Sequence, residues 1–128
     1  MMNEADLKAR DERDLQARTK SFALRIVRLY CSLPKTTEAQ VLGKQVLRSG
    51  TSVGAHYREA MRARSVAEFI SKVEGALQEL EETVYWLELL IESEIVPEVR
   101  LSDLLREAKE LIAMLVASAR TAKGRRSR

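Results

Sequence analysis

The chain has 128 residues, of which 45% are hydrophobic and 32% are charged, and its formal net charge is +3. This length suits one domain with a buried core, and five glycines and two prolines are too few for a sheet of many tight turns. A single cysteine, Cys31, excludes an internal disulfide. No apolar run reaches the roughly 18–20 residues of a membrane span, and the N-terminus lacks a hydrophobic signal segment, so we expect a cytoplasmic protein with no membrane partner.

Residues 11–33 form the first predicted helix. Its apolar positions recur at helical spacing on one face: Leu15, Phe22, Ile26, Leu29 and Leu33. Pro34 ends the helix, because the residue before a proline is pushed out of the helical region. We expect Cys31 to be a buried thiol. Residues 1–17 are mostly polar, and whether they lengthen this helix or fray stays open.

Residues 38–62 form the second predicted helix, with Thr37 and Gln40 as its capping box. Its core face carries Leu42, Val46, Val53 and Ala60. Three glycines, Gly43, Gly50 and Gly54, fall within about 40° of one another around the helix. Glycine inside a helix is unfavourable, so three aligned glycines predict a close approach by another helix. The alternative is a weak or kinked helix.

Residues 66–95 and 102–122 form the third and fourth predicted helices. The third has Ser65 and Glu68 as its capping box and a heptad-like stripe of Phe69, Val73, Leu77, Leu80, Val84, Leu87 and Ile91. Pro97 ends it. The fourth has Ser102 as its predicted N-cap and a broad apolar face: Leu104, Leu105, Ala108, Leu111, Ile112, Leu115, Val116 and Ala119. Residues 123–128 form a basic tail with no apolar content, which we expect to be disordered.

The predicted connections are about 3–6 residues long, which forces neighbouring helices to run antiparallel. The sequence therefore predicts an all-α fold, an up-down-up-down four-helix bundle in which residues 1–122 make one domain. Charge is distributed unevenly along it: residues 44–65 carry 5 − 1 = +4, residues 66–99 carry 1 − 9 = −8, and residues 100–128 carry 8 − 3 = +5. This pattern favours packing or assembly by charge complementarity, and it leaves basic surface for a polyanion.

No pattern of residues predicts catalysis, a metal site or a cofactor. His56 is the only histidine, whereas a di-iron bundle needs two Glu-x-x-His motifs. We expect His56 to be a hydrogen-bonded histidine at the edge of the core. The chain has no phosphate-binding glycine loop, no dinucleotide loop and no nucleophile with a partner base, so we expect no enzyme and no catalytic residues.

The outer face of the second predicted helix is basic. Lys44, Arg48, Arg58 and Arg62 lie together, pointing directly away from its core face, and Arg64 extends the row into the next connection. Such a row suits contact with nucleic-acid phosphates. The alternatives are a solvated helix face or a face paired with a neighbouring acidic helix.

The back of the third predicted helix carries an apolar patch. Tyr85, Trp86 and Leu89 lie opposite the core stripe, so a lone bundle would expose all three. Glu81 and Glu88 line one flank. Tyrosine and tryptophan are typical anchors of protein interfaces, so these five residues predict homo-oligomerisation. Alternatively, the first or fourth helix covers the patch.

The chain resembles the small bacterial four-helix-bundle family of the 23S rRNA-intervening sequence proteins. The likeness lies in residues 47–60 (LRSGTSVGAHYREA), 62–65 (RARS), 68–70 (EFI) and 82–90 (ETVYWLELL). This resemblance implies a homopentameric ring and no agreed catalytic residues. Through a related accessory protein of diversity-generating retroelements, it also implies binding of nucleic acid and of a reverse transcriptase by a basic surface, here with Arg48, Arg58, Arg62 and Arg64.

Two functions follow as hypotheses. The first is a non-enzymatic homo-oligomer, favoured as a pentamer, that binds RNA or DNA through its basic surface. The second is a protein-interaction scaffold without nucleic-acid binding, whose basic face makes contacts between subunits or with another protein.

Overall fold

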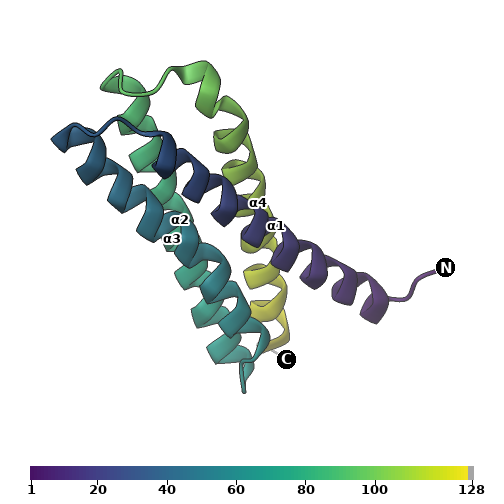
Figure 1. Ribbon diagram of the computed structural model, residues 1–128. Coiled ribbons are helices and arrows are strands. Elements are labelled where there is room, and N and C mark those ends of the chain that lie inside the picture. Colours follow the sequence, from purple (N-terminus) through teal and green to yellow (C-terminus); the bar gives the residue numbers. More distant parts are fainter. Residues whose placement is uncertain (127–128) are drawn as a thin grey trace.

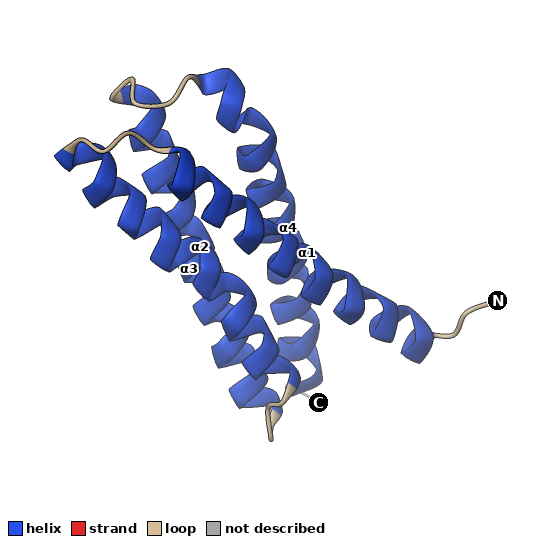
Figure 2. Cartoon of the chain, in the orientation of Figure 1, coloured by secondary structure: helices blue, strands red, loops and turns tan. Residues whose placement is uncertain are grey.

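The computed structural model describes residues 1–126, which form four helices and no strand (Figures 1 and 2). These are α1 (Glu4–Ser32), α2 (Thr37–Met61), α3 (Val66–Glu92) and α4 (Glu98–Arg126). The predicted four-helix bundle is confirmed. No helix within the described residues is long and apolar enough to cross a membrane.

Neighbouring helices run in opposite directions, as the residue pairs between them show. Moving forward along α2, Gly43 meets Leu33 and Gly54 meets Thr19, so α1 is traversed backwards. The same holds for α2 and α3, where Ser49 bonds to Thr83 and Glu59 bonds to Lys72. In Figure 1 the chain turns back at each connection, and the N-terminal part of α1 extends away from the other three helices. The contact between α1 and α4 is accordingly the least extensive of the four helix pairings.

The N-termini of α1, α2 and α4 differ from the prediction, whereas that of α3 agrees with it. α1 begins at Glu4, where Asn3 Oδ1 accepts a hydrogen bond from Asp6 N at 2.8 Å, so the polar N-terminal segment lengthens the helix. α2 is capped by Thr36 instead of Thr37, with Thr36 Oγ1 3.4 Å from Ala39 N. The cap predicted at Ser65 is confirmed, because its Oγ accepts from Glu68 N at 3.0 Å.

The start of α4 was also predicted too late. Ser102 is not its N-cap but lies inside the helix, where its hydroxyl donates to the Val99 carbonyl at 3.1 Å. Helix α4 starts at Glu98, directly after Pro97. Proline has no backbone N–H to leave unpaired and its fixed φ suits a helix start. Pro97 therefore precedes the start of α4. It does not end α3 as predicted, because α3 ends at Glu92 and not at residue 95.

The C-terminus of α4 corrects the prediction of a disordered tail. Residues 123–126 are helical, while residues 127–128 lie outside the described part of the chain. The physical reason is that Ala122, 5% exposed, continues the buried face one turn beyond the predicted stripe. Burial there supports another turn of helix despite the polar sequence that follows.

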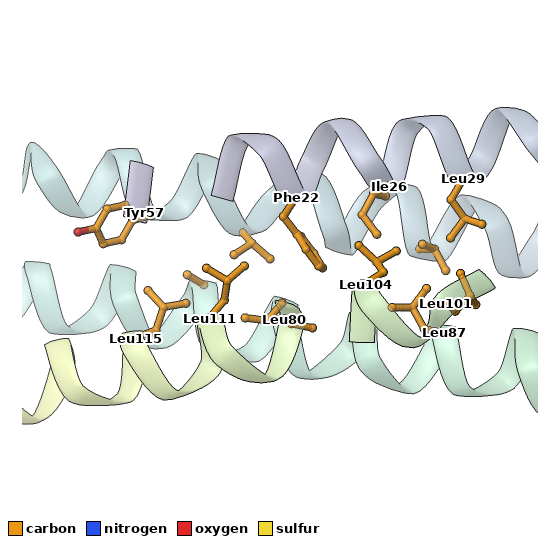
Figure 3. Close-up of a cluster of buried hydrophobic side chains, with 14 of the residues drawn as sticks. Phe22, Ile26, Leu29, Tyr57, Leu80, Leu87, Leu101, Leu104, Leu111 and Leu115 are labelled. Atoms are coloured by element: carbon orange, nitrogen blue, oxygen red, sulfur yellow. The ribbon is translucent and has the colours of Figure 1, made fainter. Parts of the chain in front are cut away.

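The core runs along the bundle axis (Figure 3). Every apolar position predicted for α1 is buried, with Phe22 and Ile26 fully so. On α3, Val73, Leu80 and Leu87 of the predicted stripe are fully buried, but the buried face extends beyond the stripe on one side. The fully buried residues include Ala76, Thr83 and Leu90, whereas Phe69, Leu77, Val84 and Ile91 are only partly buried. Because α3 packs on both α2 and α4, its buried arc is broader than one heptad stripe.

The three aligned glycines of α2 mark the close approach that was predicted, and the neighbour is α1. A Cβ atom added at Gly50 would lie 2.7 Å from Ile26 Cγ1, and one at Gly43 would lie 2.6 Å from Leu33 Cδ1. Real Cβ atoms do not approach that closely, so glycine allows α1 to pack directly on the α2 backbone.

Cys31 is exposed, so the prediction of a buried thiol was wrong. Its apolar neighbours one and two turns earlier, Val27 and Leu24, are themselves 39% and 47% exposed. This face of α1 points away from the bundle axis. Apolar spacing alone did not distinguish it from the core face.

Candidate nucleic-acid interface

The predicted basic row lies on the solvent side of α2 and of the connection to α3. The glycine face of α2 packs on α1, and the face around Ser49 packs on α3, which leaves the row outside. Four members, Lys44, Arg58, Arg62 and Arg64, are exposed, and none makes an ion pair with any residue in the range 1–126. Their charges are therefore available to a partner.

Arg48 differs from the rest of the row. Its Nη1 lies 3.0 Å from Glu79 Oε2 and its Nη2 lies 3.2 Å from Glu82 Oε1, both on α3. One of the alternatives, pairing with a neighbouring acidic helix, is thus realised within the chain at this position. Glu79 and Glu82 largely neutralise Arg48, which leaves it less suited to phosphate than the other four.

A second ion pair joins α2 and α3 with the opposite polarity. Lys72 Nζ donates to Glu59 Oε2 at 2.6 Å. This hydrogen bond lowers the pKa of Glu59 and raises the pKa of Lys72. Glu59 is the only acid within residues 44–65, and its pairing with Lys72 offsets the one negative charge that lies among the basic side chains of α2.

The structure adds a cation that the sequence analysis missed. Arg125 of α4 lines the same hollow, of about 300 Å³, as Arg64 and as Lys8 of α1. Cationic groups from three elements therefore meet at the end of the bundle where α2 passes into α3. Glu12 lines this hollow as well. The run of basic residues at the C-terminus could have indicated this cation. Because the tail was predicted to be disordered, Arg125 was not placed in the fold.

His56 is partly buried at the α2–α3 contact and lies beside Gly75. Its Nδ1 is buried, and no group in the described part of the chain bonds to it, so the hydrogen bond predicted for His56 is not made by this atom within residues 1–126. A Cβ at Gly75 would sit 3.4 Å from Nδ1, which places the ring against helix backbone whose polar groups are already paired. Among the described residues no group of three or more His, Cys, Asp or Glu side chains could hold a metal ion.

The predicted oligomer patch on α3 is smaller than expected. Tyr85 is 55% exposed, Glu81 and Glu88 are exposed, and Leu89 is partly exposed. Trp86, however, packs against the core, and its Nε1 is buried with no partner in the described part of the chain, so the expectation that a lone bundle exposes all three apolar residues is wrong. Trp86 follows Thr83 by three residues, about 60° around the helix, and Thr83 faces α2.

Comparisons with known proteins agree with this architecture. The family model described as 23S rRNA-intervening sequence protein matches residues 12–117. A solved structure from Bacteroides thetaiotaomicron, described as a protein of unknown function from the S23 ribosomal protein family, is 39% identical with a TM-score of 0.82. That match covers 86% of this chain and 98% of the other. The search of curated proteins found no match.

Proposed function

Because this chain belongs to the 23S rRNA-intervening sequence protein family, we propose that it is a non-enzymatic homo-oligomer that binds RNA or DNA. The observation that carries the proposal is the exposed, unpaired basic row of Lys44, Arg58, Arg62 and Arg64. Arg125 extends this row at the end of the bundle. No cofactor is part of the proposal.

The geometry of the row suits a phosphate backbone. Lys44 and Arg62 are separated by 18 residues of one helix, or about 27 Å at 1.5 Å per residue. That length corresponds to about eight base pairs of a duplex at 3.4 Å per step. Contacts of this kind are electrostatic and independent of sequence, because they replace condensed counterions on the phosphates. The proposal therefore concerns affinity for the backbone and not recognition of bases.

The proposed oligomer forms through the exposed side of α3. Tyr85 presents a large aromatic surface to solvent, with Leu89 one turn further along the helix and with Glu81 and Glu88 on the flank. An exposed aromatic beside charged residues is typical of a subunit contact. A pentamer is the assembly that the family resemblance implies.

A second candidate function has one observation in its favour. Arg48 already pairs with the acidic residues Glu79 and Glu82 of its own α3, and the same chemistry between subunits would use the remaining cations of α2 against a neighbouring α3. The protein would then be an interaction scaffold, and its basic face would contact another subunit or a partner such as a reverse transcriptase.

Removing the three arginine charges of the basic row distinguishes the two candidate functions. We propose the triple variant Arg58→Gln, Arg62→Gln, Arg64→Gln, matched with Arg28→Gln, Arg106→Gln, Lys109→Gln, which removes three exposed charges from α1 and α4. Binding of labelled RNA and DNA is measured by fluorescence anisotropy, and the mass of each variant by light scattering.

If nucleic acid binds the row, the first variant loses at least about tenfold in affinity and keeps the mass of the wild-type protein, whereas the matched variant binds nearly as the wild type. Dissociation of the oligomer in the first variant alone, without nucleic-acid binding by the wild type, supports the scaffold instead. Equal binding by both variants contradicts the assignment of these arginines.

A further inference from the structure

A groove of about 430 Å³ lies between the N-terminal half of α1 and the C-terminal half of α4. It arises because α1 diverges from the rest of the bundle toward its N-terminus (Figure 1). Its walls are largely apolar and come from α1, α3 and α4: Leu7, Leu15, Phe69, Met114, Ala117 and Ala122. A volume of this size is in the range of pockets that hold small organic molecules.

Tyr57 lies at the base of the groove. Its side chain is 0% exposed, and its hydroxyl is buried without a hydrogen-bond partner among residues 1–126. In Figure 3 this hydroxyl points away from the core leucines, toward the end of the cluster. A buried hydroxyl without a partner is unfavourable, so a ligand that bonds to it recovers free energy that the empty groove lacks.

The surroundings of the hydroxyl are negative. Burial raises the pKa of Tyr57, and the carboxylates of Glu12 and Asp11 raise it further. Glu4 and Asp11 line the groove and make no ion pair within residues 1–126. Glu12 is paired, because its Oε1 lies 3.8 Å from Lys8 Nζ. Arg125 is the other cation in the lining. Near Tyr57 the field therefore favours a cation over an anion.

Much of the α1 wall lies outside the span that the family model matches. Glu4, Leu7, Lys8 and Asp11 precede the span of residues 12–117 that the family model matches. The groove thus depends on the N-terminal part of α1. Its lining shares Lys8 and Arg125 with the hollow beside Arg64, but its one residue from α2 is Tyr57.

We propose that this groove binds a small amphiphilic amine, with its apolar body against the walls and its ammonium group donating to Tyr57 Oη and to the carboxylate of Asp11. An amine matches all three features: apolar walls, an unpaired phenol and unpaired acidic groups. A fatty acid in the same groove would bring its carboxylate toward the carboxylates of Asp11 and Glu12, which is unfavourable. An alcohol would satisfy Tyr57 without gaining from the acidic groups.

The test uses the full chain and three probes of equal length, which are n-octylammonium, 1-octanol and octanoate, titrated by isothermal calorimetry. Octylammonium is expected to bind at one site per chain, with octanol at least about fivefold weaker and octanoate weaker still. Octanoate binding as tightly as octylammonium would overturn the proposal, and so would the absence of saturable binding by octylammonium.

Two variants locate the site. Tyr57→Phe removes only the unpaired hydroxyl, so the fold is retained while affinity for octylammonium falls by about fivefold or more. Ala117→Phe fills the groove and abolishes binding, and Val116→Phe, at the neighbouring exposed position outside the lining, leaves binding unchanged. Unaltered affinity in either Tyr57→Phe or Ala117→Phe places the amine elsewhere and refutes the proposed site.

Discussion

Gly50 shows how a single missing side chain sets the distance between two helices. Ile26 fills the space beside it so closely that an added Cβ would lie 2.7 Å from Cγ1 and 2.9 Å from Cγ2. Ile26 is itself fully buried, so it has no free volume into which to move. The aligned glycines of α2 therefore fix the α1–α2 packing at the level of individual atoms.

We predict that Gly50→Ala lowers the free energy of unfolding by roughly 1–2 kcal/mol, because overpacking outweighs the gain in helix propensity. Gly124→Ala is the matched control, since no atom of the described residues lies within 4 Å of a Cβ there. That variant should be neutral or more stable by up to about 1 kcal/mol. Urea unfolding measures both. Equal stability of Gly50→Ala and the wild type would show that α1 and α2 are less tightly packed than described.

The ion pair between Glu59 and Lys72 makes a prediction about pH. Because Lys72 lowers the pKa of Glu59 below its usual 4.5, the stabilisation is present above that pH and is lost as pH falls through the lower folded value. Because Glu59 raises the pKa of Lys72 above its usual 10.5, the same stabilisation is lost as pH rises through the higher folded value.

We therefore expect Glu59→Gln to lower the thermal midpoint slightly near pH 7 and not at all near about pH 2, where both proteins carry a neutral group at this position. The effect is small because both side chains are exposed to solvent. Circular dichroism melts of the two proteins at the two pH values provide the measurement. A difference in midpoint that persists in acid would mean that Glu59 acts through packing instead of charge.

At the scale of elements, the number and type of the helices follow from the sequence, because long apolar periodicities interrupted by Pro34 and Pro97 have few other solutions. The helix ends were harder to predict. Thr36 and Thr37 are adjacent candidates for one cap, and only the hydrogen bond to Ala39 N distinguishes them. Ser102 resembled a cap in sequence, but Pro97 starts the helix one turn earlier.

The orientation of each helix was predicted less well than its existence. In a bundle each helix contacts two neighbours, so its buried arc extends to both sides of the stripe that periodicity identifies. Trp86 lies on the side of α3 that turns toward α2 and is packed against the core. Cys31 lies beyond the buried arc of α1 and is exposed. The apolar periodicity of one helix does not indicate where its neighbouring helices lie.

The candidate site was only partly predictable, because local spacing places the residues of one helix but not the contacts between helices. The exposed cations Lys44, Arg58, Arg62 and Arg64 are a property of one helix and its connection, and the sequence places them together. The pairing of Arg48 with α3 and the arrival of Arg125 from α4 are contacts between elements. These depend on the register of the bundle, which local spacing does not specify.

For the whole molecule, the exposed surface of α3 predicts self-association. Tyr85→Asp places a charge where an aromatic side chain would be buried between subunits, so the oligomer should dissociate toward the 14.5 kDa chain. Val99→Asp is the control, because Val99 is 81% exposed at the start of α4 and no interface is assigned to it. Light scattering after size exclusion gives the masses.

Tyr85 is preferred to Trp86 for this experiment because Trp86 packs against the core of its own chain. A charge at Trp86 would therefore disturb folding together with assembly. An unchanged mass for Tyr85→Asp, or a wild-type protein that is already monomeric, would contradict the interface on α3.

The salt dependence of nucleic-acid binding shows whether the basic row holds a phosphate backbone. The logarithm of the association constant for a labelled duplex is measured against the logarithm of the salt concentration, for the wild type and for Arg58→Gln, Arg62→Gln, Arg64→Gln. Each phosphate contact contributes about 0.9 to the slope, so the account predicts a wild-type slope that is steeper by about 2–3 than that of the variant. Equal slopes, or a wild-type protein that does not bind at low salt, would contradict the claim that this basic row holds a phosphate backbone.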